Sequence, residues 1–403
     1  MRIGTNLKNC TVLKMNNLRY STQTVTESDI KAVKKVLYSD WLTQGPQTAL
    51  FENKIKKKIN SKYAVAVNSG SSALLLACKA LSLKKGDIFW TVPNTFVATA
   101  NCGLLCDAKV DFVDIDPKTW NISLENLEKK LIEAKKKKIL PKVLIVVHLA
   151  GLPANPKILF NLSKKYNFKI IEDASHSLGA TYFSKKVGSC YWSDITVFSL
   201  HPVKIITTGE GGLCVTNNKK IYENLLLYKN NGITNNKKKF TFKNLGPWYY
   251  EQQTLGYNFR MSEIQAALGV SQLKKLDRFV KRRNQLAKIY LKNLKNFPLQ
   301  MQKVDKNFTS TYHLFIIKLN DNKSNLHFKL FNFLRKNKIY VNLHYLPVHL
   351  HPFFKKKGFK NKNFPISENY SKSAMSIPIY PNLTKKDQFR VIFLIKNFFN
   401  KNA

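Results

Sequence analysis

Short apolar runs alternate with helical patterns through the first half of the chain, and this alternation most constrains the fold. The runs at 109–115 and 142–148 predict buried strands, and a charged amphipathic helix pattern lies between them. Further strand patterns occupy 62–67, 88–92, 169–173, 194–200 and 212–216. Neighbouring parallel strands need a long crossover connection, which a helix usually supplies. The alternation therefore predicts an α/β fold with a mainly parallel sheet.

One lysine, Lys204, lies between two of these predicted strands. Pro202 restricts the backbone just before it, and glycines at 209, 211 and 212 allow a tight turn after it. A lysine held between apolar strands loses hydration, so its pKa should fall and its amine should become a nucleophile. Such an amine suits a Schiff base with a carbonyl cofactor. From this stretch alone, a lysine that extends from a loop into water is an equally good interpretation.

A second stretch favours the cofactor hypothesis. The strand pattern at 169–173 ends in Asp173, and Ser175 and His176 follow it. Pyridoxal 5'-phosphate needs a carboxylate beside its ring nitrogen, because a protonated ring is the better electron sink. Ligand groups in open α/β sheets gather at the carboxyl ends of strands. We therefore expect Asp173 and Lys204, 31 residues apart, at one site.

Five segments in the same order resemble the DegT/DnrJ/StrS sugar aminotransferases, a family with the aspartate aminotransferase fold. They are 42–46 (LTQGP), 68–73 (NSGSSA), 172–176 (EDASH), 199–212 and 256–261 (GYNFRM). The matching region runs from about residue 20 to residue 353. The resemblance implies fold type I of the pyridoxal-phosphate-dependent transferases. It also implies a large domain with a mainly parallel seven-stranded sheet and a smaller α+β C-terminal domain.

The expected organisation is an N-terminal arm at 1–25, a large cofactor-binding domain at 26–281 and a small domain at 282–403. A capping-box pattern at Thr26 and Asp29 opens the first helix. One long helix is expected from 261 to at least 280. Residues 230–254 are too long for an ordinary connection and are expected near the site entrance or a partner subunit. Residues 1–14 match nothing in the family pattern, so Met15 is a second candidate for the start.

The resemblance also implies how the cofactor is held. Lys204 would bind it covalently, Asp173 would face its ring nitrogen and His176 would contact its ring hydroxyl, although the family often has glutamine there. Phe96 would stack on the pyridine ring, where core packing is the ordinary alternative. The phosphate would be bound by Gly70, Ser71, Ser199 and, across a homodimer interface, Asn258 of the partner subunit. A Ser/Gly-rich helix start without a ligand is the alternative for 70–71.

The candidate substrate residues are Thr43, His344, Tyr345 and His349. Thr43 belongs to the loop that lies at the sugar end of the site in the family, and a plain interhelix turn is the alternative. Two imidazoles and a phenol beside a proline turn could hydrogen-bond a sugar or a diphosphate. Surface histidines on a turn are the alternative for His344 and His349.

The segments 20–26, 42–46, 199–204 and 344–349 look most like the pseudaminic acid branch of the family. That branch moves the amino group of L-glutamate to C4 of a UDP-linked 4-keto-6-deoxy-N-acetylhexosamine of L-arabino configuration. The resemblance therefore implies a nucleotide-sugar aminotransferase with shared active sites in a homodimer. Another UDP- or dTDP-linked keto-sugar is the alternative substrate.

The chain is strongly basic, with 67 Lys and Arg against 24 Asp and Glu and a formal charge of +43. Such a charge alone suggests nucleic acid, so a basic regulatory protein on the same fold is the competing hypothesis. However, the lysines form short clusters, such as 56–58 and 135–138, on faces expected to be exposed. We therefore expect the charge to attract an anionic cofactor and nucleotide, with no nucleic-acid partner.

Neither a membrane span nor a metal site is expected. No apolar run reaches the roughly 18 residues of a span, and the amino terminus lacks a signal-peptide core, so a cytoplasmic protein is expected. The six cysteines are at 10, 78, 102, 106, 190 and 214. Cys102 and Cys106 share one helix face, but no second pair completes a zinc site. The cysteines are expected to be free thiols, mostly buried.

Overall fold

The computed structural model of the chain describes residues 17–242, 246–320 and 324–402. The alternative start at Met15 and the thiol of Cys10 lie outside these residues. The other five cysteines are free and buried, as expected. Across the described ranges, no helix is both long and apolar enough to cross a membrane.

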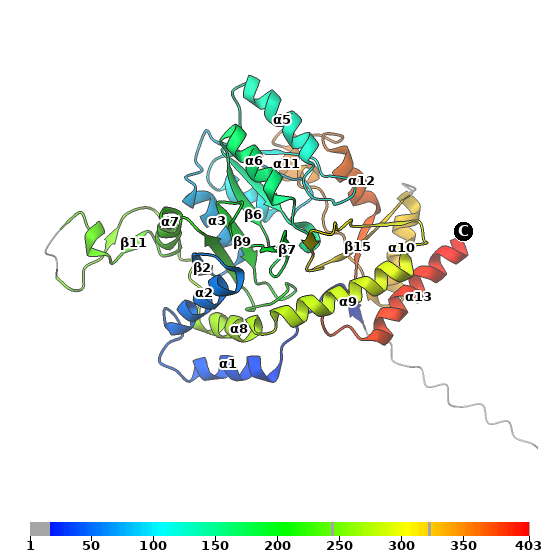
Figure 1. Cartoon of the computed structure of the whole chain (residues 1–403), viewed down its shortest axis with the longest axis horizontal. Helices are drawn as coiled ribbons and strands as arrows, with labels where there is room; N and C mark the ends of the chain where they lie inside the picture. The colour runs from blue at the N-terminus through cyan, green and yellow to red at the C-terminus, as the bar shows by residue number, and fades with distance from the viewer. Residues whose placement is uncertain (1–16, 243–245, 321–323, 403) are drawn as a thin grey trace, which may run out of the picture.

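The centre of the large unit is a seven-stranded sheet with the order β2-β10-β9-β6-β5-β3-β4 (Figure 1). β10 is antiparallel to both of its neighbours, and every other adjacent pair is parallel. The expectation of a mainly parallel seven-stranded sheet is therefore confirmed. The strands are β2 (Tyr63–Val67), β3 (Ile88–Thr91), β4 (Lys109–Phe112), β5 (Val143–Val147), β6 (Lys169–Asp173), β9 (Ile195–Ser199) and β10 (Gly212–Thr216).

Helices cover both faces of this sheet because successive side chains of a strand point to opposite sides. In β5, Val143 and Ile145 pack with α3 (Gly70–Ala80), α4 (Ala98–Leu104) and α7 (Lys219–Lys229). Leu144 and Val146 of the same strand pack on the opposite side, with α5 (Leu124–Lys136) and α6 (Pro156–Tyr166). The apolar face of α2 (Pro46–Ile59) packs on that opposite side at the β2–β10 end of the sheet, together with α8 (Glu263–Leu273).

The segment from 261 onward forms two helices, so the expectation of a single long helix is wrong. α8 ends at Leu273, and α9 (Leu276–Leu294) begins after a break at 274–275. α9 continues across the predicted domain boundary at 281/282. Its N-terminal part packs on the large unit through Phe279, and its C-terminal part packs in the small unit through Tyr290. The boundary itself stays a prediction, because this one helix belongs to both cores.

The small unit lies to one side of the large one, around a three-stranded antiparallel sheet (Figure 1). The strand order is β13 (Leu299–Met301), β15 (Phe315–Leu319) and β17 (Ala374–Ile377). The helices α9, α10 (Ser324–Lys336) and α13 (Lys385–Asn402) pack around it. The shorter helices α11 (Pro352–Lys355) and α12 (Pro365–Ser373) complete this half of the chain.

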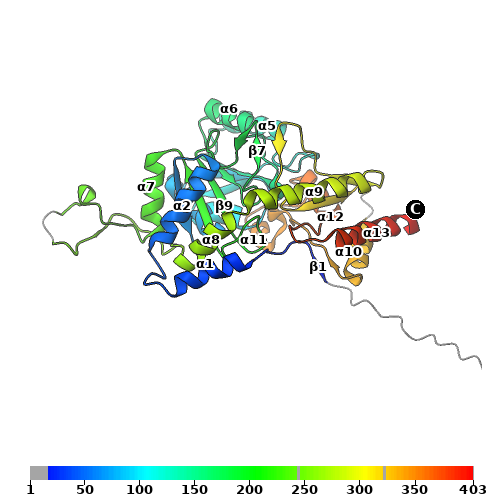
Figure 2. The ribbon, with the colours of Figure 1, turned by 60° about the horizontal axis from the view of Figure 1, so that its bottom comes forward.

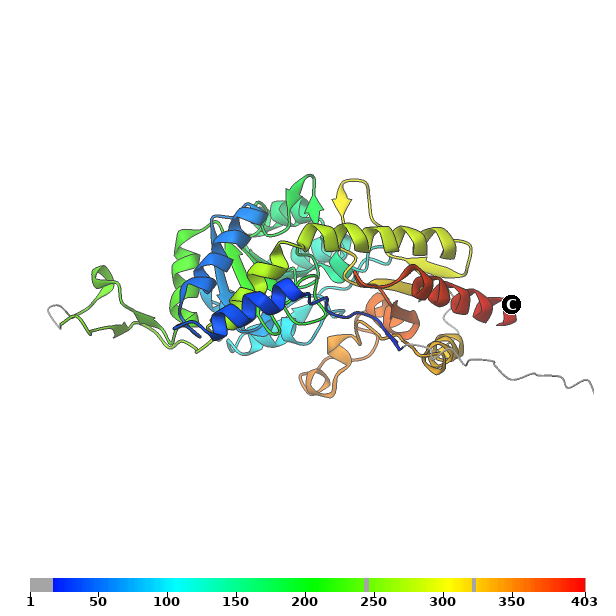
Figure 3. The same ribbon diagram turned by 90° about the horizontal axis from the view of Figure 1, so that it is seen from below.

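The N-terminal segment joins the two units. β1 (Leu18–Arg19) pairs in parallel with β16 (Ile339–Tyr340) of the small unit, and α1 (Glu27–Leu37) packs on α8 of the large unit. Figure 3 shows the connecting segment passing from one unit to the other. The capping box at the start of α1 is present as expected, because the Thr26 amide donates to Asp29 Oδ2 at 2.8 Å.

A hairpin projects from the large unit, away from the small one (Figure 2). It contains β11 (Ile233–Thr234) and β12 (Glu251–Gln252), which pair antiparallel. Trp248 and Leu255 near it are each 81% exposed. A second small sheet of β7 (Thr181–Tyr182), β8 (Lys185–Lys186) and β14 (Phe308–Thr309) lies elsewhere on the surface.

Candidate active site

The carboxyl ends of β6 and β9 open into a cavity of about 580 Å³ between the two units. The start of α3, the start of α4 and the segment after β16 supply its other walls. Nine of the residues proposed from the sequence line this cavity: Gly70, Ser71, Phe96, Asp173, His176, Ser199, Lys204, His344 and Tyr345. They come from five separate parts of the chain, which only the folded topology brings together.

Asp173 ends β6, and both of its carboxylate oxygens are held. Oδ2 accepts a hydrogen bond from Thr99 Oγ1 at 2.7 Å. Oδ1 accepts from the amide of Ser175 at 3.2 Å and from its hydroxyl at 2.6 Å. Asp173 is therefore fixed by its own loop on one side and by α4 on the other.

Lys204 lies in the turn between β9 and β10. Its amide donates to the carbonyl of His201 at 2.9 Å, which fixes the start of the turn. Loss of hydration in the cavity lowers the pKa of Lys204 to about 8, and the negative charge of Asp173 acts in the opposite direction. The lowered pKa confirms the expectation from the apolar flanking strands. An amine with this pKa is unprotonated in about a tenth of molecules at pH 7, far more often than an ordinary lysine, and the unprotonated form is the nucleophile.

Three buried imidazoles surround this lysine. His176 Nε2 lies 3.2 Å from Tyr345 Oη, while His176 Nδ1 is buried without a hydrogen-bond partner in the described chain. The ring of His313 packs on His176, with centroids 4.4 Å apart. Burial holds the pKa of His176 and of His313 well below the usual range, and it lowers the pKa of His344 to about 3. All three rings are therefore neutral at physiological pH.

The start of α3 forms the opposite end of the cavity. The helix begins at Gly70, because the Ser69 hydroxyl caps it by accepting from the Ser72 amide at 3.1 Å. A Cβ on Gly70 would lie 2.9 Å from Ser199 Cβ, so only glycine permits this approach of α3 to β9. Free amides at a helix start, with the positive end of the helix dipole, form an anion site.

Phe96 stands on the wall of the cavity with 57% of its surface exposed. Its ring centroid lies 6.1 Å from that of Tyr345. It is therefore not a core residue, and its face is available to a planar ligand.

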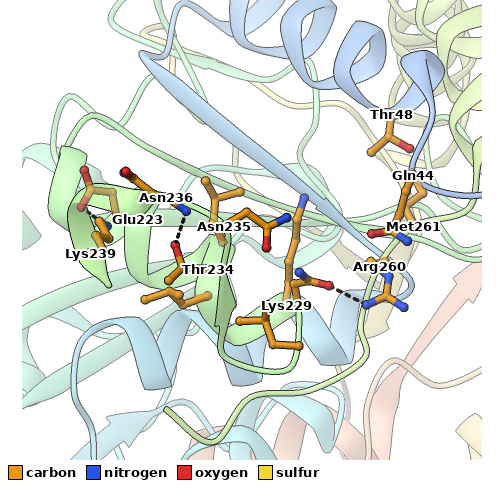
Figure 4. A pocket seen from close by; sticks show the side chains of 14 residues that line it. Gln44, Thr48, Glu223, Lys229, Thr234, Asn235, Asn236, Lys239, Arg260 and Met261 are labelled. Carbon is orange, nitrogen blue, oxygen red and sulfur yellow. Dashed lines mark hydrogen bonds and ion pairs between the residues drawn. The ribbon is translucent and has the colours of Figure 1, made fainter. Parts of the chain in front are cut away.

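Two of the proposed residues lie apart from this cavity, near a second hollow of about 460 Å³ (Figure 4). Asn258 forms a bridge with Asn230, and Thr43 forms one with Ser262. Asn230 lines the second hollow together with Arg260, whose Nη1 donates to Asn230 Oδ1 at 2.6 Å. Asn258, expected at a subunit interface, and Thr43, expected at the sugar end of the site, thus lie at a separate place on the same chain.

His349 lies in neither hollow, and the expectation that it binds substrate is not retained. The proline turn carries 348–350 into the core, where the Val348 amide donates to the carbonyl of Pro93 at 2.8 Å. His349 is fully buried, and its Nε2 lies 3.0 Å from Glu368 Oε1. It therefore ties this turn to α12.

Several cavity residues were not found from the sequence. Tyr20, Thr95, Thr99 and His313 all line the cavity. Thr99 and Asp173 are 74 residues apart, so no local motif connects them. Thr95 precedes α4 and Thr99 lies in its first turn, so helical periodicity could not have paired the two threonines.

These residues fit pyridoxal 5'-phosphate by their own chemistry. The cavity offers an amine of lowered pKa, a firmly held carboxylate, an imidazole nitrogen without a partner and a helix start that only glycine can form. Each matches one group of the cofactor: carbonyl, ring nitrogen, ring hydroxyl and phosphate. No group of three or more His, Cys, Asp or Glu side chains in the described ranges could hold a metal ion.

The fold and the cavity together define a fold type I transferase, the class that uses pyridoxal phosphate. Residues 23–396 match the DegT/DnrJ/EryC1/StrS aminotransferase family, and the chain belongs to this family of aminotransferases. The match covers both units and all of the cavity residues except Tyr20.

Several relatives whose names state an activity are similar to this chain over nearly their full lengths. The chain is 37% identical to a UDP-4-amino-4,6-dideoxy-N-acetyl-beta-L-altrosamine transaminase of Campylobacter jejuni, over 92% of this chain and 94% of that protein. It is 31% identical to the GDP-perosamine synthase of Escherichia coli O157:H7, over 93% and 97%. Among solved structures, Helicobacter pylori PseC, an aminotransferase involved in the biosynthesis of pseudoaminic acid, superposes with a TM-score of 0.88 at 29% identity. That superposition covers 96% of this chain and all of PseC.

Proposed function

We propose that the protein transfers the amino group of L-glutamate to C4 of UDP-2-acetamido-2,6-dideoxy-β-L-arabino-hex-4-ulose, with pyridoxal 5'-phosphate as cofactor. The observation that carries the amino-transfer chemistry is the single cavity that holds Lys204, Asp173 and His176. The choice of sugar is supported by the similarity to the Campylobacter transaminase and to PseC. The cytoplasmic location stays a prediction from the sequence.

Pyridoxal phosphate supplies an electron sink that carries an amino group from a donor to an acceptor. Lys204 would hold the cofactor through its carbonyl carbon and, once displaced by the donor, would take a proton from the α-carbon of the donor. Asp173 would keep a proton on the ring nitrogen, and His176 would bind the ring hydroxyl. Gly70, Ser71 and Ser199 would bind the phosphate.

The sugar would lie on the small-unit side of the cavity. His344 Nδ1 bonds Ser376 Oγ at 2.8 Å, which leaves its Nε2 for a ligand. Tyr345 Oη lies beside His176 and is placed to contact both cofactor and sugar. Neutral groups suit an acetamido and hydroxyl pattern better than charged ones, because they donate and accept without a large desolvation cost.

We further propose a homodimer in which Asn258 and Thr43 serve the cavity of the partner. Both lie away from the cavity of their own chain, near the hollow with Arg260. The hairpin with Trp248 and Leu255 adds exposed apolar surface that a second copy could cover.

A side-by-side assay with L-glutamate tests the choice of sugar. It compares the UDP-linked L-arabino 4-ketose, its D-xylo epimer and dTDP-4-keto-6-deoxyglucose, with products identified by mass and NMR. We expect the L-arabino sugar to give the highest kcat/KM, with the new amine at C4. Preference for the dTDP sugar, or amination at C3, would reject the proposed substrate but would leave the aminotransferase assignment standing.

A further inference from the structure

Thr95, just before α4, and Thr99, in the first turn of α4, form a hydrogen-bond chain that ends on Asp173. Thr95 Oγ1 lies 2.9 Å from Thr99 Oγ1, and Thr99 Oγ1 lies 2.7 Å from Asp173 Oδ2. The two threonines are 2% and 1% exposed, and both line the cavity. The chain is therefore shielded from bulk water and belongs to the site.

The direction of both hydrogen bonds follows from counting protons. A carboxylate can only accept, so the proton between Thr99 and Asp173 comes from Thr99. A hydroxyl has one proton, so Thr99 can then only accept from Thr95. Both hydroxyl dipoles consequently point toward the carboxylate of Asp173. Donors aligned in this way stabilise a negative charge, and each strengthens the next at low dielectric.

Thr99 holds the carboxylate oxygen that nothing else in the described chain is seen to hold. The Ser175 donors both bind Oδ1, whereas Thr99 binds Oδ2. Ser175 belongs to the same loop as Asp173, but Thr99 comes from a different element. Without Thr99, the carboxylate would be fixed from one side only and could turn about its terminal bond.

We propose that Thr99, polarised by Thr95, is a positioning residue that keeps Asp173 oriented and charged for the ring nitrogen of the cofactor. The proposal rests on the proposed function, because it assigns a role toward pyridoxal phosphate. Phe96 lies between the two threonines, so the segment 95–99 would set both the stacking of the ring and its protonation. Neither threonine needs to touch the cofactor for this role.

Four variants separate this role from simple packing. Thr99→Val keeps the shape and removes the donor, whereas Thr99→Ser keeps the donor. Thr95→Val removes only the polarising hydroxyl. The matched control is Thr91→Val, since Thr91 is equally buried and its hydroxyl donates to the carbonyl of Ile145 at 2.9 Å, away from Asp173.

The main readout is the 15N resonance of labelled pyridoxal phosphate bound to each full-length variant, which reports protonation of the ring nitrogen. In Thr99→Val we expect this resonance to move toward that of an unprotonated pyridine. We also expect the single-turnover reaction with L-glutamate to slow roughly tenfold to a hundredfold, as loss of a hydrogen bond to a charged group implies. Thr95→Val should show a smaller shift in the same direction, and Thr99→Ser should restore the wild-type resonance. Thr91→Val should leave both readouts unchanged.

An unchanged resonance and rate in Thr99→Val, or equal losses in Thr91→Val, would overturn the inference. If Thr99→Val does not fold, the comparison of Thr95→Val with Thr99→Ser tests the same inference. A shifted 15N resonance in Thr95→Val with a wild-type resonance in Thr99→Ser would support it, and a wild-type resonance in both would overturn it. Failure of the proposed function is distinguishable, because a wild-type protein that binds no cofactor on Lys204 would give no labelled resonance in any variant.

Discussion

His176 Nε2 and Tyr345 Oη lie 3.2 Å apart and join the two units directly across the candidate site. His176 follows β6 of the large unit, and Tyr345 follows β16 of the small one. The contact therefore couples the seating of the small unit to the position of the imidazole that would meet the ring hydroxyl of the cofactor.

The first prediction tests this contact. Tyr345→Phe removes the phenol oxygen and leaves both nitrogens of His176 without a hydrogen-bond partner among the described residues. We expect kcat to fall about tenfold, which corresponds to the roughly 1–1.5 kcal/mol of a net hydrogen bond. The control is Tyr290→Phe, whose hydroxyl bonds the carbonyl of Pro378 at 2.8 Å in the small unit. That variant should lose stability but keep kcat; equal kcat in both variants would remove the coupling role from Tyr345.

The second prediction concerns the buried hydrogen bond between His349 and Glu368. His349→Ala leaves a cavity and removes a partner of Glu368, so we expect a loss of about 2–4 kcal/mol in the free energy of unfolding. The KM for the nucleotide sugar should stay within about twofold of wild type, since His349 lies outside both hollows. Urea unfolding and steady-state kinetics measure the two effects. A large rise in KM with unchanged stability would return His349 to the substrate residues.

The third prediction concerns pH. Burial lowers the pKa of His176, His313 and His344 in the folded protein, so the unfolded chain binds more protons than the folded one below about pH 6.5. The folded state should therefore lose stability as pH falls from about 6.5 to 5, by up to about 1.4 kcal/mol per pH unit for each imidazole. Above about pH 6.5 the three neutral imidazoles no longer lower the stability of the folded state. Urea unfolding across this range should show a shallower slope in His344→Asn; an identical slope would contradict the assignment of His344 as a neutral buried ring.

The fourth prediction concerns assembly. If Asn258 serves the partner, the active form is at least a homodimer, and dilution to monomers should release the cofactor. Light scattering and the visible absorbance of the bound cofactor, followed through one dilution series, should change together. A fully active monomer would remove this role from Asn258.

The sequence predicted most of the fold and the centre of the site, for a physical reason. Buried parallel strands are continuous apolar runs, and the ends of such strands gather ligand groups, so Asp173 and Lys204 could be placed together. The break between α8 and α9 could not be found, because the apolar spacing continues on both sides of 274–275.

The remaining misses are contacts between distant segments. His313 packs on His176 across 137 residues, and Thr99 reaches Asp173 across 74. The first contact depends on how the two units meet and the second on how α4 packs against the end of β6, and no local pattern encodes either. His349 was misplaced for the same reason, since a histidine on a turn can face either solvent or core.

The central claim is that Lys204 carries the cofactor. The most direct test is borohydride reduction of the purified full-length protein with added pyridoxal phosphate, followed by peptide mass mapping. We predict a yellow protein whose visible absorbance is bleached on reduction, with the cofactor mass fixed on the peptide that contains Lys204. Lys204→Ala should fold with a wild-type Tm, remain uncoloured and lack amino transfer. A colourless wild-type protein, or cofactor mass fixed on another lysine, would contradict the account.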